Sequence, residues 1–339
     1  MSQPSTTDRP PVVLAVHLVW EAILLLVVGI VAVLAATVPE VSVFSHGNVW
    51  SRLVLLGLPA IALAFSLRTG TPNLAIGAMA GASGAIFAEL NVDGWAGPAA
   101  GLVAVLLTVL FGLVLALIVG LGAPVWAVSL GGLAVAQAVS LGVNQTKGST
   151  VLLHASGLSP GVFQGLAVPV VLVSLAGGAL WALPGPRQAL SLGAPARAPG
   201  GRATGRLVPA LVGFGGSSLL AALAGILNVL YLHASMPQDS ASVLLPALGA
   251  VLLGGVSAHG RGGGIAGTIL AVFLLDLIGL WLLIEGVPSW VATTLIAGLA
   301  ILVGTVIGAL LSLISRALGG PRPAYPGPGG QPEPPNQLA

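Results

Sequence analysis

Long, uninterrupted apolar runs follow one another from near the start of the chain to about residue 315. Runs such as AILLLVVGIVAVLAATV are continuous, whereas the strands of transmembrane barrels alternate between polar and apolar residues. A bilayer-spanning helix needs about 20 such residues. The pattern therefore predicts an all-α integral membrane protein with ten spans, at about 12–38, 51–67, 72–90, 95–121, 124–143, 166–183, 207–233, 244–256, 264–284 and 289–315. The eighth is short, so we expect it to tilt inside the bundle or to cross only in part.

Composition supports a membrane protein. Of the 339 residues 56% are hydrophobic and only 6% are charged, whereas a soluble domain carries about 25% charged residues. The first span is too long for the core of a signal peptide and contains His17 and Glu21, so we interpret it as a retained helix. We expect a short N-terminal tail (1–11), a transmembrane domain (12–315) and a disordered Pro/Gly-rich C-terminal tail (316–339).

The basic residues divide unequally between the two sides of these spans. With a cytoplasmic N-terminus, two of the eleven fall outside, Arg52 and Lys147, and nine fall inside: Arg9, Arg68, Arg187, Arg197, Arg202, Arg206, Arg261, Arg316 and Arg322. Positively charged loops favour the cytoplasm. Both termini are therefore predicted to be cytoplasmic.

Small residues recur at helical spacing after two breaks in the apolar pattern. The sequence RTGTPNLAIGAMAGASGA contains Gly77, Gly81 and Ala85, and the later copy contains Gly263, Gly267 and Ala271. Small residues four apart let helix backbones approach closely in lipid. Pro72 suits the first turn of the third span, with Asn73 beside its N-terminus. LPA precedes both breaks, which indicates either a distant internal repeat or a chance similarity.

Four stretches resemble the permease subunits of ABC importers, in the ribose, simple-sugar and nucleoside branch related to branched-chain amino-acid permeases. GTPNLAIGA (70–78) is similar to the family's G-I-D-L-S-V-G-S, with Asn73 at the acidic position. ALGAVLLGGVSAHGRGGGIAGTIL (247–270) resembles A-V-V-L-G-G-T-S-L-x-G-G-x-G-x-x-x-G-T-L. SSLLAALAGILNVLYLHAS and APVWAVSLGGLAVAQAVSLG are similar to two further family segments.

The resemblance implies one half of a dimeric pore, with cytoplasmic ATPase subunits, an extracytoplasmic substrate-binding protein and a second permease subunit as partners. It also implies a coupling loop with an E-A-A-like core, where this chain has LGAPARAPGGRATG (192–205) and lacks the glutamate. Either the ATPase is adapted to an arginine-rich loop or the chain is the weaker half of a heterodimer. We expect Arg187, Arg197, Arg202 and Arg206 to form this loop's docking surface rather than only a lipid anchor.

Polar residues inside spans are candidates for a substrate pathway. Asp276 is costly in a ninth span and either lines the route or bonds another helix. Glu21 fits a local pair with His17 better than a pathway role. Asn73 stands at a helix start, and Gln137 and Asn228 lie inside spans, where they serve the pathway or join helices.

Several classes of function are excluded or disfavoured. The chain has no GxxxxGK[ST] phosphate loop, no cysteine, no cluster at metal-ligand spacing and a net charge of only +2, so we expect no ATPase activity, cofactor, metal site or nucleic-acid partner. We predict the permease subunit of an ABC importer for a sugar or nucleoside in a prokaryotic plasma membrane. The alternatives are a proton-coupled secondary transporter using Asp276 or Glu21, and a non-transporting half of a heterodimeric permease.

Overall fold

The computed structural model describes residues 10–37, 48–146, 151–152, 158–183, 186, 190, 204–236, 240–257, 264–288 and 290–319. Residues 1–9 and 320–339, which include most of the expected C-terminal tail, lie outside the described residues. The described helices are α1 (Pro10–Thr37), α2 (Asn48–Arg68), α3 (Ile76–Val92), α4 (Gly97–Gly120), α5 (Val125–Thr146), α6 (Pro160–Ala182), α8 (Thr204–Leu232), α9 (Ser240–Leu253), α10 (Gly267–Ile284) and α11 (Ile296–Gly319). A π-helical turn, η1 (Val291–Leu295), leads into α11, and two short strands, β1 (Val151–Leu152) and β2 (Ala234–Ser235), pair antiparallel.

The expected all-α membrane fold is confirmed. Eight described helices are long and apolar enough to cross a membrane, and α3 and α9 are shorter apolar helices of 17 and 14 residues. These two correspond to the expected third and eighth spans. The chain is a multi-pass membrane protein, and the side on which each connection lies stays a prediction.

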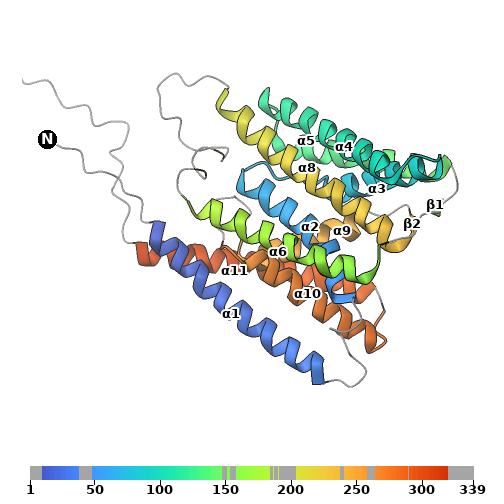
Figure 1. Ribbon diagram of the computed structural model, residues 1–339. Helices are drawn as coiled ribbons and strands as arrows, with labels where there is room; N and C mark the ends of the chain where they lie inside the picture. The colour runs from blue at the N-terminus through green and yellow to red at the C-terminus, as the bar shows by residue number, and fades with distance from the viewer. Residues whose placement is uncertain are drawn as a thin grey trace, which may run out of the picture.

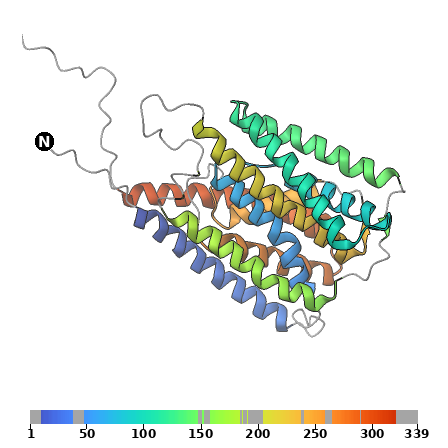
Figure 2. The ribbon, with the colours of Figure 1, turned by 45° about the horizontal axis from the view of Figure 1, so that its top comes forward.

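The bundle is built around α2. Most residues of α2 are buried, whereas most residues of α1, α5 and α11 are not buried, although these helices are apolar. In both ribbon views α1 and the pair α4–α5 lie at opposite edges of the bundle, and α1 begins at the same end where α11 stops (Figures 1 and 2). Apolar side chains on the outer helices suit contact with lipid, which is itself apolar, and each helix satisfies its own backbone groups there.

A compact turn separates α2 from α3. The helix ends with Gly70 in a left-handed conformation (φ +74°), and the Thr71 amide donates to the Ser66 carbonyl at 2.9 Å, a common way to end a helix. The buried Asn73 then accepts a hydrogen bond from the Ala75 amide at 3.1 Å. Because of this turn, α3 begins only at Ile76, and the expected place of Pro72 in its first turn is wrong.

The connection after α9 also begins with a glycine in a left-handed conformation, but here a side chain of α1 bonds the start of the next helix. Gly255 has φ +80°, and the Val256 amide donates to the Val251 carbonyl at 3.1 Å. The Glu21 carboxylate of α1 accepts hydrogen bonds from the amides of Ala266 and Gly267, both at 2.7 Å, at the start of α10. The sequence suggests only a local partner for Glu21, whereas these contacts reach across the bundle.

Glycines allow the central helices to approach closely. A Cβ on Gly225 of α8 would lie 1.9 Å from the Ala80 carbonyl oxygen of α3, and a Cβ on Gly77 would lie 2.3 Å from the Ser240 carbonyl oxygen. A Cβ on Gly267 would lie 2.0 Å from the Gly254 carbonyl oxygen. Gly81 is less crowded, since its nearest neighbour is the Ser140 hydroxyl at 3.1 Å. Gly263 lies outside the described residues.

Candidate functional site

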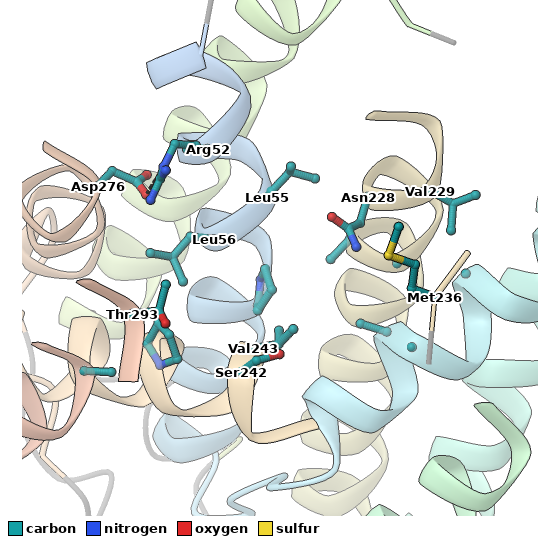
Figure 3. A pocket seen from close by; sticks show the side chains of 18 of the residues that line it. Arg52, Leu55, Leu56, Asn228, Val229, Met236, Ser242, Val243, Asp276 and Thr293 are labelled. Atoms are coloured by element: carbon teal, nitrogen blue, oxygen red, sulfur yellow. Dashed lines mark ion pairs between the residues drawn. The ribbon is translucent and has the colours of Figure 1, made fainter. Parts of the chain in front are cut away.

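A cavity of about 300 Å³ lies among α2, α3, α8, α9, α10 and the η1–α11 segment. Most of its wall is apolar, as is usual for pockets that hold small molecules, and a few polar side chains converge on it. Figure 3 shows Arg52 and Asp276 together on one side and Asn228 with Met236 across from them. The cavity therefore combines two of the four expected pathway residues, Asp276 and Asn228.

Arg52 and Asp276 form an ion pair between α2 and α10. Arg52 Nε lies 3.6 Å from Asp276 Oδ1, which is longer than a hydrogen bond. The Asp276 side chain is only 5% exposed, whereas that of Arg52 is 29% exposed. Gly279, one turn beyond Asp276, leaves room for the guanidinium, since a Cβ there would lie 3.3 Å from Arg52 Nη2. The pair places two balanced charges at the cavity wall.

The second carboxylate oxygen of Asp276 is not satisfied by the protein. Asp276 Oδ2 is buried and has no hydrogen-bond partner within the described part of the chain. A buried charged acceptor without a partner costs free energy, and in a membrane span such a group marks a functional site or an unfilled contact. One acceptor of Asp276, a residue of the cavity wall, is thus unsatisfied within the described part of the chain.

The prolines of the two LPA tripeptides both line the cavity. They are Pro59 of α2 and Pro246 of α9. Proline has no N–H, so the carbonyl of Leu55, four residues before Pro59 and also at the wall, loses its regular helical donor. The repeated LPA sequence therefore marks two helices that face one cavity.

Strand β2 and the residue after it border the cavity beyond the end of α8. Ala234, Ser235 and Met236 line the wall. The Ser235 hydroxyl donates to Asn144 Oδ1 at 2.9 Å, and the Asn144 amide nitrogen donates to the Ser140 carbonyl at 2.8 Å. These bonds fix the segment after α8 against α5.

Asn73 and Gln137 are not among the residues that line the cavity. Asn73 is fully buried, and its amide nitrogen donates to the Ser217 hydroxyl of α8 at 2.9 Å. Gln137 lies on α5, which packs against α3. The structure thus groups Asp276 with Asn228 and keeps the other two candidates apart from them.

Of the four arginines expected in the coupling loop, only Arg206 is described. It is exposed in the first turn of α8. Arg187, Arg197 and Arg202 lie outside the described residues.

Arg52 is a site residue that sequence reasoning missed. The sequence places it among the outer basic residues and does not identify its partner. The available signal is that Arg52 lies in the second span, where a charge calls for an opposite charge on another helix. Within the described residues no three His, Cys, Asp or Glu side chains gather as a metal site would require.

Comparison with known proteins supports the resemblance. The chain is 39% identical over 97 residues to the autoinducer 2 import system permease protein LsrD of Photorhabdus laumondii subsp. laumondii, and 38% identical over 97 residues to the LsrD proteins of Escherichia coli and Shigella flexneri. The match spans 29% of this chain and 28–29% of these relatives. They are import-system permeases, the class that the sequence resemblance predicts. The chain matches no protein-family model, and no solved structure matches it.

Proposed function

We propose that this chain is the transmembrane permease subunit of an ABC importer that carries a small polar solute, a sugar or nucleoside, across a prokaryotic plasma membrane. The observation that carries the proposal is the 97-residue similarity to import-system permeases. A multi-pass helical fold with a partly polar cavity supports it.

The proposed partners follow from this role. Two permease subunits, identical or different, form the translocation unit, an extracytoplasmic binding protein delivers the solute, and cytoplasmic ATPase subunits supply the energy. The chain itself hydrolyses nothing. Asp276 and Asn228 line the solute's route at the cavity, and the loop with Arg187, Arg197, Arg202 and Arg206 contacts the ATPase.

Deletion of the gene from its source organism tests the proposal. The deletion strain should lose uptake of one radiolabelled sugar or nucleoside, and this chain should restore the uptake only when the neighbouring ATPase gene is intact. Restoration with the Walker lysine of that ATPase replaced by alanine would contradict the proposal. It would favour the proton-coupled carrier instead.

A further inference from the structure

The unsatisfied oxygen of Asp276 indicates what kind of guest the cavity accepts. Asp276 Oδ2 is buried, has no partner among the described residues and belongs to a side chain that lines the cavity. An ionised carboxylate only accepts hydrogen bonds, so its natural complement is a hydroxyl or another donor. A guest with a hydroxyl at this point would remove the cost of the empty acceptor.

Arg52 adds donors beside this acceptor. Its guanidinium carries five N–H groups, and within the described residues its ion pair with Asp276 is a single contact of 3.6 Å. The side chain is partly exposed, so donors remain available at the wall. A solute with two neighbouring oxygens could therefore donate from one hydroxyl to Asp276 and accept at the other oxygen from Arg52.

The balance of charge at the wall argues against ionic guests. An anion attracted by Arg52 would meet the negative Asp276, and a cation attracted by Asp276 would meet Arg52. The other wall residues within the described part of the chain are uncharged, among them Asn228, Thr293, Ser242 and Ser235. The Asn228 amide faces the cavity from the opposite side, and it can both donate and accept (Figure 3).

Apolar residues complete a site for the carbon skeleton. Leu55, Leu56, Pro59, Val243 and Pro246 line the cavity between the polar groups. A volume of about 300 Å³ lies at the lower end of the range for small-molecule pockets. These features fit a small ring or short chain with apolar faces and polar edges.

We propose that this cavity is a solute-recognition site inside a single subunit, selective for an uncharged polyol whose adjacent oxygens engage Asp276 and Arg52. Asn228 completes the site from α8. The proposal rests on the proposed function in placing the solute route here. It adds Arg52 as a specificity-determining residue, and it assigns part of the selectivity for the solute to the permease subunit itself.

A thiol-protection experiment on the purified full-length chain in lipid nanodiscs tests the site. The chain has no cysteine, so Met236→Cys introduces one thiol at the wall, where the native side chain is half exposed. N-methylmaleimide, which is uncharged, modifies this thiol. The probes are D-ribose and ribitol as uncharged polyols and D-ribonate as the matched anion.

We expect D-ribose or ribitol to slow the modification and D-ribonate to have no effect. Asp276→Asn should weaken the protection about tenfold, as loss of a charged hydrogen-bond acceptor does. Glu285→Gln is the matched control, because Glu285 is an exposed acid just after the same helix and does not line the cavity, so protection should persist.

An exchange of the two charges separates recognition from stability. The double variant Arg52→Asp with Asp276→Arg keeps an ion pair between α2 and α10, so thermal stability should recover toward that of the unsubstituted chain. Protection by polyols should stay lost, because the acceptor and donors have changed places. Recovery of both would assign the pair a structural role and overturn the proposal.

Protection by neither uncharged polyol, or equal protection by D-ribonate, would also overturn it. This result is distinguishable from failure of the proposed function, because the isolated chain needs no ATPase for the measurement. Protection without ATP-dependent uptake would retain the site and reject the importer. Uptake without protection would retain the importer and reject the site.

Discussion

Glu21 and Gly267 lie 246 positions apart, yet a carboxylate oxygen of Glu21 accepts the Gly267 amide hydrogen at 2.7 Å. The same oxygen accepts the Ala266 amide, so one side chain of α1 satisfies two donors at the start of α10. A negative group there also complements the positive end of the helix dipole. Nearby, Arg68 Nη2 donates to the Gly264 carbonyl at 2.8 Å, which ties α2 to the same turn.

The Glu21 contact predicts a marked loss of stability on truncation. Glu21→Ala should lower the free energy of unfolding by about 3 kcal/mol, because it leaves two amides without their acceptor and removes a negative charge near buried Arg68. Glu21→Gln keeps one acceptor oxygen and should cost about half as much. Thermal unfolding in nanodiscs measures both, with Glu285→Ala as the exposed acidic control. Equal stability of the Ala and Gln variants would contradict the capping role.

The glycine contacts predict that replacing glycine by alanine changes the stability differently at three positions. The sequence alone leads us to expect that alanine is mild at both Gly81 and Gly267, with leucine costly. At Gly267 the structure revises this expectation, because even a Cβ would lie 2.0 Å from a backbone oxygen. Gly267→Ala should cost about 3 kcal/mol through overpacking. Gly81→Ala should be nearly neutral, because its neighbour is a rotatable hydroxyl.

Gly29→Ala is the matched control on α1, where nothing lies within 4 Å of the added Cβ. It should not destabilise the chain, since alanine favours helices more than glycine does. Thermal-shift assays compare the three variants. A Gly267→Ala chain as stable as the Gly81→Ala chain would show that α9 and α10 do not approach this closely at their connection.

The two breaks show how far sequence could lead. The Asn73 turn is local, because its acceptor serves an amide two residues on, so sequence could place a polar residue beside the start of α3. The α10 start instead uses Glu21, and the cavity pair joins Arg52 to Asp276 on distant helices. Apolar length and small-residue spacing follow from the lipid solvent, whereas partners across the bundle depend on tertiary packing. Sequence therefore identified Asp276 but not Arg52.

The predicted orientation can be tested at the two ends of α4. Trp95 precedes this helix and Leu121 follows it, and both are exposed. With the N-terminus inside, an impermeant maleimide added to intact cells should modify Trp95→Cys and leave Leu121→Cys unmodified until the membrane is opened. The reverse pattern would invert the topology. Modification of both would mean that α4 does not span the membrane.

The arginine loop predicts a charge-dependent contact with the ATPase. Reversing two charges, Arg197→Glu with Arg202→Glu, should reduce co-purification of the ATPase at least tenfold, because guanidinium groups pair with carboxylates at such contacts. Arg197→Lys with Arg202→Lys keeps the charge and should retain more of the complex. Membrane insertion should be unchanged in both. Normal assembly and transport by the Glu variant would leave the loop only as an anchor to anionic lipid.

Transport in proteoliposomes tests the central claim most directly. The chain, with its permease partner and ATPase, is reconstituted with the binding protein outside, and uptake of the labelled sugar or nucleoside is measured with ATP supplied to the ATPase or with a proton gradient. We predict uptake with ATP and none with the proton gradient alone. Uptake by this chain without the ATPase, driven by the proton gradient, would contradict the account.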